Sequence, residues 1–333
     1  MTSSASRPSA SDAGEGRGTP SIRLRADALT LAYDAHVVSR NLDLDLAAGE
    51  LTAIVGPNAC GKSTLLRALA RLHRPTEGVV LLDGADIAGM ATKRVARRVG
   101  LLSQSARVPD GMTVRDLVSR GRFPHQGLLS QWSGADEAAT VRAMELTGVA
   151  ELAHRDVDAL SGGQRQRVWL AMVLAQETPT ILLDEPTTYL DLAHQVEMLQ
   201  LCRRLNEEQD RTIVAVLHDL NQAARCAEHM IVMHEGRVRT TGSPREILTE
   251  DLIEEVFGLA AVIAPDPVAG TPMVVPRHLG AVVPAGPDPA GTRSAPTDST
   301  GGPAPQSSAD PASAGTSPTA RSQQDGQERN TDR

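Results

Sequence analysis

The segment from Gly56 to Ser63 has the residue types and spacing of a phosphate-binding loop. It fits the pattern G-x-x-x-x-G-K-[ST], and it lies between an apolar run that predicts a strand and a helical pattern. In that setting, backbone N–H groups and the positive end of the helix dipole surround phosphate oxygens. Lys62 is expected to reach the β- and γ-phosphates and assist catalysis, and the Ser63 hydroxyl to ligate Mg²⁺. The predicted ligand is ATP, contacted by Gly56, Pro57, Asn58, Ala59, Cys60, Gly61, Lys62, Ser63 and Thr64.

Two consecutive carboxylates follow a second apolar run, at Asp184 and Glu185. A buried strand ending there would bring Asp184 to the Mg²⁺ side of the phosphates. Glu185 could then polarise the attacking water as a general base. A hydrophobic run that ends in Asp-Glu is mostly structural when it occurs alone. The preceding phosphate loop makes hydrolysis of the triphosphate the favoured interpretation.

A third glycine pattern, Leu160-Ser-Gly-Gly-Gln164, begins another helical stretch. Ser161 is the expected N-cap, and the helix N-terminus could bind a second anion. Alone, the pattern would more often be an ordinary glycine-rich cap. With the two preceding motifs in order, the chain resembles the nucleotide-binding subunit of an ATP-binding cassette (ABC) transporter, whose signature is this pentapeptide.

The resemblance implies roles for further residues across about 260 positions. Tyr33 matches the aromatic residue that stacks on adenine, and Gln104 the glutamine that contacts Mg²⁺. Asp191 lies in a loop that communicates across a dimer, and His218 matches a histidine that senses the γ-phosphate and assists catalysis. Singly, these residues would be interpreted as a packed tyrosine, a solvated strand end and a surface histidine. The signature residues Ser161, Gly162, Gly163 and Gln164 would complete the ATP site of a second subunit.

The fold class predicted is α/β. Apolar runs at 51–55, 180–183 and 212–217, alternating with helical patterns, predict a parallel-rich sheet covered on both faces. The resemblance makes this a P-loop NTPase core with an antiparallel N-terminal β portion. A helical subdomain inserted at about 106–172 is expected within an ABC domain at 21–279. Small, polar segments at 1–20 and 280–333 predict a disordered N-terminus and a disordered Pro/Gly/Ser/Ala-rich tail.

Composition limits the class of protein. The 333 residues carry a net charge of −8, which argues against nucleic acid as a partner. Three cysteines without metal or disulfide spacing fit a reducing compartment. No apolar run approaches the ~18 residues that cross a bilayer, and the first 20 residues do not predict a secretory signal. We therefore expect a soluble chain whose membrane role comes through a partner, and the resemblance implies a peripheral protein at the cytoplasmic face of the cell membrane.

The resemblance also implies partners and a cargo. The ATPase is expected to form a homodimer, or a dimer with a related subunit, on separate permease chains served by an extracytoplasmic substrate-binding protein. The segments 121–126, 186–192 and 218–224 resemble the iron(III)-siderophore importers, with haem and cobalamin importers as alternatives. A non-transport ABC ATPase of DNA repair or translation and a regulatory nucleotide-binding module are the rival classes. Residues 106–135 are expected to face the permease, with Arg122, Phe123 and His125 as contacts, or to form a solvated loop around one buried Phe.

Overall fold

The computed structural model describes residues 21–104, 111–127, 132–188 and 190–277. The segments predicted to be disordered, 1–20 and 280–333, lie outside the described residues, as does part of the 106–135 segment. Within the described part of the chain, no helix is both long enough and apolar enough to span a membrane.

A six-stranded sheet forms the centre of the folded region, in the order β10-β9-β3-β8-β7-β6. All neighbouring strands are parallel except the β9–β10 pair. The strands are β3 (Leu51–Val55), β6 (Val99–Leu102), β7 (Thr180–Asp184), β8 (Thr212–Val216), β9 (His229–His234) and β10 (Arg237–Gly242). Every residue of β3, β7 and β8 is buried, as near-continuous apolar runs require in a sheet covered on both faces. The predicted α/β class is confirmed.

A second, antiparallel sheet contains the N-terminal strands in the order β2-β1-β4-β5. Its strands are β1 (Ile22–Tyr33), β2 (His36–Ala47), β4 (Glu77–Leu82) and β5 (Ala85–Asp86). The buried positions of β1 change from even numbers, Leu24 and Ala26, to odd numbers, Leu29 and Leu31. The change occurs at Ala28, which has a φ of 48° and interrupts the register with β2. A bulge with one extra residue explains why the alternation in the sequence shifts phase.

Helix α1 (Lys62–Leu69) packs in a core shared by the two sheets, with Leu65, Leu66 and Leu69 fully buried. Leu65, Leu66, Leu69 and Leu72 have helical spacing in the sequence and predict a helix that reaches Leu72, which is wrong at its end. Leu72 is 70% exposed because the helix ends at Leu69. Nearby are the short elements η1 (Ile87–Gly89) and α2 (Thr92–Ala96).

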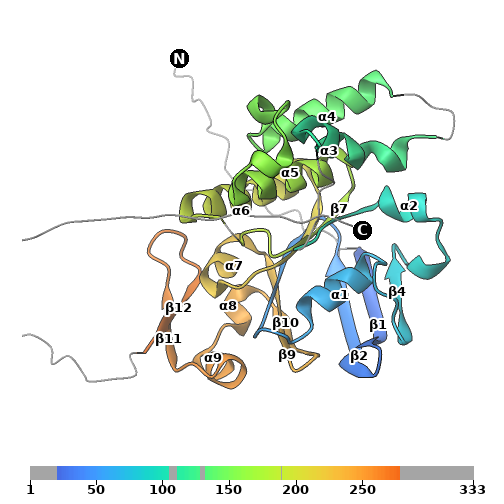
Figure 1. Cartoon of the computed structure of the whole chain (residues 1–333). Helices are drawn as coiled ribbons and strands as arrows, with labels where there is room; N and C mark the ends of the chain where they lie inside the picture. Colours follow the sequence, from blue (N-terminus) through green and yellow to red (C-terminus); the bar gives the residue numbers. More distant parts are fainter. Residues whose placement is uncertain (1–20, 105–110, 128–131, 189, 278–333) are drawn as a thin grey trace, which may run out of the picture. The chain divides into compact units, whose positions relative to one another are not determined.

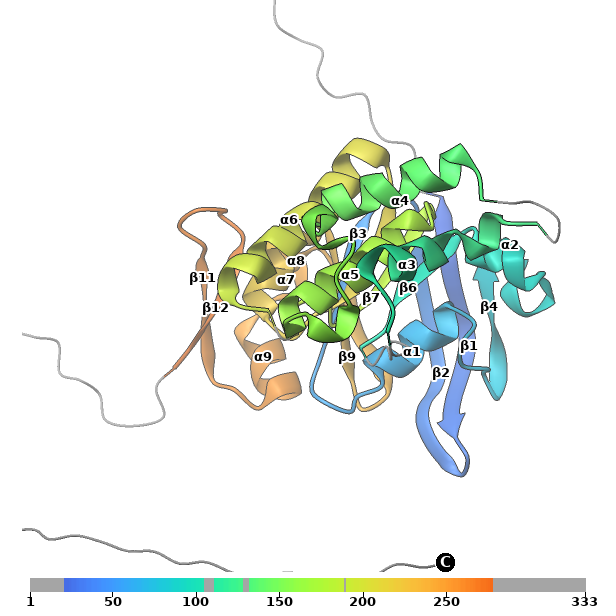
Figure 2. The same cartoon turned by 45° about the horizontal axis from the view of Figure 1, so that its top comes forward.

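Helices without strands of their own follow β6, and they are drawn in green in Figure 1. They are α3 (Val114–Ser119), the 3-10 segment η2 (Arg120–His125), α4 (Gly134–Leu146), η3 (Ala150–Leu152), η4 (Val157–Ala159) and α5 (Gly162–Ala175). The sequence patterns predict helices at 113–120, 135–146 and 164–175, and these match α3, α4 and α5 to within two residues. Figure 2 shows α3, α4 and α5 gathered together beside the central sheet.

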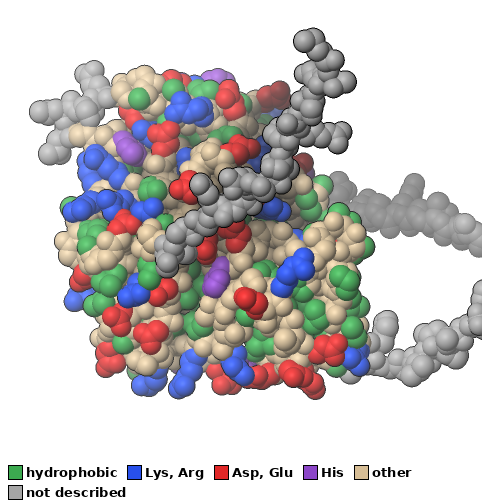
Figure 3. Space-filling view, turned by 180° about the vertical axis from the view of Figure 1, so that it is seen from behind, with side chains coloured by type: hydrophobic (Ala, Val, Ile, Leu, Met, Phe, Trp, Pro, Cys, Tyr) green, Lys and Arg blue, Asp and Glu red, His purple; other side chains and the backbone are tan. Residues whose placement is uncertain are grey.

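The remaining elements return to the central sheet and end in a hairpin. They are α6 (Leu192–Gln209), α7 (Leu220–Cys226), α8 (Pro244–Ile247), α9 (Glu250–Phe257), β11 (Ala261–Pro265) and β12 (Pro272–Pro276). Strands β11 and β12 pair only with each other and lie beside α7 (Figures 1 and 2). On the face shown in Figure 3, acidic and basic side chains are interspersed rather than gathered by sign.

Candidate functional site

The phosphate loop joins β3 to α1, and its backbone conformation explains its glycines. Gly56 has a φ of 151°, and a Cβ there would lie 2.1 Å from the carbonyl oxygen of Met233 on β9. Gly61, directly before α1, has a φ of 101°. Any larger side chain at Gly56 would push the loop off the sheet, so the close approach of β9 fixes the residue type.

The Lys62 side chain is 5% exposed and lies within the loop. Its Nζ donates to the carbonyl oxygens of Gly56 at 2.7 Å and Pro57 at 2.8 Å. A buried ammonium group must be hydrogen-bonded, and here the loop itself supplies the acceptors. Phosphate oxygens can replace these acceptors when a nucleotide binds.

Ser63 and Asp184 meet across the start of α1 and the end of β7. The Ser63 hydroxyl donates to Asp184 Oδ1 at 2.7 Å. Asp184 is 1% exposed, and its Oδ2 atom is buried without a hydrogen-bond partner among the described residues. Burial raises the pKa of the Asp184 carboxyl and outweighs the lowering by the Ser63 hydrogen bond and by the charges of Arg67 and Lys62.

This pair of oxygen donors fits Mg²⁺. A hard cation prefers carboxylate and hydroxyl oxygens, and Mg²⁺ bound to a nucleotide takes only one or two ligands from the protein. The unpartnered Oδ2 of Asp184 is the kind of acceptor that a metal-bound water would satisfy. No cluster of three or more His, Cys, Asp and Glu side chains that could hold a metal exists among the described residues. Ser63 and Asp184 are therefore the residues that would hold the ion.

Glu185 follows β7 and is held by three side chains. His218 Nε2 lies 2.7 Å from its Oε1, and Gln104 Nε2 donates to its Oε2 at 2.6 Å. Thr188, which the sequence did not single out, donates to Oε2 at 3.2 Å. Glu185 has a φ of 53°, so a left-handed residue turns the chain directly after the strand. The contact of Gln104 with Mg²⁺ stays a prediction, because its amide group here faces Glu185.

A cavity of about 280 Å³ brings most of these residues together. Lys62, Ser63, Glu185 and His218 all line it. The full lining is His36, Val38, Asn58, Ala59, Cys60, Gly61, Lys62, Ser63, Thr64, Glu185 and His218. The sequence did not point to His36 and Val38 of β2, because their only signal is their position shortly after Tyr33. The walls of the cavity come from the loop and the start of α1, from the first residues of β2, and from the residues that follow β7 and β8.

The signature residues lie elsewhere, at the N-terminus of α5. Ser161 caps this helix as expected: its Oγ accepts from Gln164 N at 3.3 Å, and its own N–H donates to Gln164 Oε1 at 3.1 Å. Ser161 and Gly162 are exposed, and neither lines the cavity. The first N–H groups of a helix have no intrahelical partner, so this end is open to an external anion.

Two further predicted residues lie at the ends of secondary-structure elements. Tyr33 ends β1 and is 43% exposed, with its ring centroid 4.6 Å from that of His73. It is outside the cavity lining, and its contact with adenine stays a prediction. Asp191 caps α6 by accepting from His194 N at 3.0 Å.

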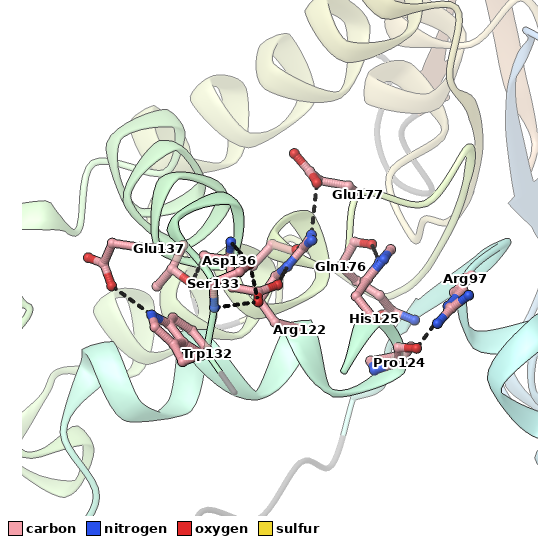
Figure 4. A network of polar contacts seen from close by, with 12 residues as sticks. Arg97, Arg122, Pro124, His125, Trp132, Ser133, Asp136, Glu137, Gln176 and Glu177 are labelled. Carbon is pink, nitrogen blue, oxygen red and sulfur yellow. Dashed lines mark hydrogen bonds and ion pairs between the residues drawn. The ribbon is translucent and has the colours of Figure 1, made fainter. Parts of the chain in front are cut away.

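Two of the three side chains expected to contact the permease, Arg122 and His125, make hydrogen bonds within the chain instead. Arg122 is 5% exposed, and it donates to Asp136 Oδ1 at 2.9 Å and to the Ala175 carbonyl at 2.7 Å (Figure 4). His125 Nε2 bonds the Gln176 carbonyl at 2.8 Å. Both side chains therefore clamp η2 to the C-terminal end of α5. Phe123 is 56% exposed, so the alternative with one buried Phe is wrong as well.

Comparison with known proteins shows the family of this chain. The family profile described as ABC transporter matches residues 39–188. The ferric enterobactin transport ATP-binding protein FepC of Escherichia coli (strain K12) is 55% identical over 262 residues, which are 79% of this chain and 96% of that protein. The chain belongs to the ABC transporter ATP-binding family. It is a transport ATPase that binds and hydrolyses ATP.

Other relatives are named for different cargoes. The petrobactin import ATP-binding protein FpuD of Bacillus anthracis is 49% identical over 77% of this chain and 94% of its own length. The cobalamin import ATP-binding protein BtuD of Halobacterium salinarum is 45% identical, over 68% of this chain and 57% of its own length.

Solved structures support the same fold. A dimeric bacterial ABC transporter cassette has a TM-score of 0.61 at 29% identity, covering 66% of this chain and 98% of that one. A post-hydrolysis dimer of an ATP-binding cassette with ADP and Pi has a TM-score of 0.60 at 28% identity, with the same coverage.

Proposed function

We propose that this ATPase powers the uptake of an iron(III)-siderophore complex through separate permease subunits. The observation that carries the cargo is the 55% identity to a ferric enterobactin transport ATPase over 96% of that protein's length. The cobalamin relative is less similar and matches over only 57% of its length. Haem and cobalamin remain the alternative cargoes to test.

The site geometry supports a role for each side chain. Lys62 would bind the β- and γ-phosphates, since a buried cation already lies within the loop. Glu185 would act as the general base toward the attacking water, because its carboxylate is fixed by His218, Gln104 and Thr188. His218 would contact the γ-phosphate from the neighbouring strand. Mg²⁺ on Ser63 and Asp184 would neutralise the charge that develops on the phosphates.

The chain carries one phosphate loop and one exposed signature helix. We propose that two subunits, identical or related, bind ATP between them so that Ser161, Gly162, Gly163 and Gln164 of each complete the other's site. A nucleotide held by donors from both chains joins the subunits, and hydrolysis separates them. Asp191 and Tyr33 would contribute across the dimer and at adenine, respectively.

The permease would contact the segment around η2, at the cytoplasmic face of the membrane. Phe123 and Trp132 are large apolar side chains exposed there, at 56% and 43%. Arg122 is buried, so its side chain is not one of the proposed permease contacts. A substrate-binding protein outside the membrane would deliver the cargo to the permease.

Uptake by cells that lack their own version of this ATPase tests the proposal. We expect the chain, expressed with its permease, to restore accumulation of a labelled ferric siderophore, and Glu185→Gln to abolish it. Parallel assays with haem and cobalamin identify the alternative importers. Co-purification with ribosomes or DNA instead of permease chains would overturn a transport role altogether.

A further inference from the structure

Helix α7 begins at Leu220, two residues after His218, and its first turn is fixed by side chains. Asp219 caps the helix by accepting from Asn221 N at 2.8 Å and Gln222 N at 2.9 Å. His218 is 46% exposed in its side chain and contacts Glu185 at 2.7 Å. Since little packing surrounds the imidazole, its position depends on the backbone that α7 holds in place.

The C-terminal hairpin anchors α7 through two side chains that are four residues apart on the helix. The Asn221 amide donates to the Val274 carbonyl at 3.2 Å and accepts from Val274 N at 2.7 Å. It therefore pairs with both main-chain groups of one β12 residue, as a neighbouring strand would. Arg225 Nε donates to Asp266 Oδ2 at 2.5 Å. Asp266 is 3% exposed and also accepts two backbone N–H groups of the β11–β12 turn.

The next residue of the same helical turn, Gln222, connects through Gln195 of α6 to the segment that precedes that helix. Gln222 Nε2 donates to Gln195 Oε1 at 2.8 Å. Gln195 in turn donates to the carbonyls of Leu190 at 3.1 Å and Thr187 at 3.4 Å. One turn of α7 thus connects the hairpin, His218 and the segment that ends at Asp191.

We propose that Asn221 is a positioning residue that fixes α7 on the β11–β12 hairpin and so keeps His218 on Glu185. The hairpin, which lies beyond the part of the chain that the family profile matches, then belongs to the hydrolytic machinery. The inference rests on the proposed role of His218 in ATP hydrolysis. A small misplacement of a catalytic group can cost up to about 100-fold in rate, so the loss of one anchor should be measurable in kcat.

The test is a double-mutant cycle on the full-length chain. We expect Asn221→Ala to lower kcat about tenfold, with the Kd of a fluorescent ATP analogue unchanged because the phosphate loop is untouched. In a His218→Ala background the same substitution should add little, because the residue it acts through is gone. Arg225→Met, at a half-exposed side chain, should give a smaller loss of kcat by the same route.

Asn206→Ala is the matched control. Asn206 also donates two side-chain hydrogen bonds to backbone carbonyls, those of Gly49 and Arg211, but it lies on α6 away from His218. It should lower the Tm without the kcat loss that depends on His218. If Asn221→Ala reduces stability too far to assay, Arg225→Met can take its place in the double-mutant cycle with His218→Ala.

The outcomes separate the two hypotheses. An equal loss of kcat in the wild-type and His218→Ala backgrounds would overturn the positioning role. An unchanged kcat in Asn221→Ala and Arg225→Met would do so as well. If His218→Ala itself hydrolyses ATP normally, the proposed role of His218 fails instead, whatever the Asn221 variants show.

Discussion

The phosphate loop and the signature helix are two anion-binding helix starts that differ in how complete they are. In the loop, Cys60, Gly61 and Lys62 are buried, and the Lys62 ammonium already has two carbonyl acceptors inside it. The start of α5 is exposed, and its capping box satisfies only part of its donors. The phosphate loop therefore has its ligand-binding groups already in place, whereas the N-terminus of α5 is suited to a ligand that another chain holds. The predictions below test this difference.

Lys62→Ala should have the largest effect. Removing the buried ammonium deletes charge-assisted contacts worth about 3 kcal/mol or more, which is at least roughly 100-fold in the Kd for ATP. Equilibrium binding of a fluorescent ATP analogue measures it. Lys93→Ala, which removes an exposed lysine bonded to the Gln126 carbonyl, is the control. Normal ATP binding by Lys62→Ala would show that the loop does not bind ATP through the Lys62 ammonium.

Glu185→Gln should retain ATP binding while hydrolysis falls by about 10²–10⁴-fold, the usual contribution of a general base. Since ATP then persists between the subunits, a closed dimer should accumulate. Single-turnover hydrolysis and light scattering after size-exclusion chromatography measure the two effects. A monomeric and fully active Glu185→Gln protein would contradict the proposed mechanism.

Ser161→Ala distinguishes a signature residue from an ordinary cap. It should cost about 1 kcal/mol of stability as a lost N-cap. Ser133→Ala is the matched control, because Ser133 forms the same capping box at the start of α4. Both variants should lower Tm similarly and leave ATP binding by the monomer intact. Only Ser161→Ala should also weaken the ATP-dependent dimer, about tenfold for one lost contact; equal dimerisation would make Ser161 merely structural.

The smallest expected effect concerns Cys60, whose thiol should react slowly with an alkylating reagent. It lies in the loop but is 6% exposed, and burial raises the pKa of its thiol. At pH 7 to 8 the thiolate fraction is therefore smaller than for a free cysteine, so alkylation should be slow and accelerate with rising pH. Mass spectrometry follows it, with Cys60→Ala as the control. Once complete, the added bulk should block ATP binding. Unaltered ATPase activity after full alkylation would refute this.

The sequence predicted features that depend on neighbours in the chain. The phosphate loop, the strands predicted at 51–55 and 180–183, and the Ser161 cap all follow from short patterns. The sequence patterns did not predict the contacts between distant segments. Arg122 is buried only because Asp136 and the Ala175 carbonyl accept its donors, and no local signal reveals those partners. His36 joins the cavity lining from β2 for the same reason, whereas Thr188 is only three residues from Glu185 and reaches it through the turn that follows β7.

The contacts of Lys62 have a thermodynamic consequence. In the proposed site, a nucleotide entering the loop would give the ammonium phosphate oxygens in place of two carbonyl oxygens, and little of the loop would have to become ordered. Most of the entropic cost of forming the shared site would then come from the association of the two subunits. Subunit concentration, more than nucleotide concentration, would decide how often the site closes. Confinement of both subunits on one permease would remove most of that cost by raising their effective concentration.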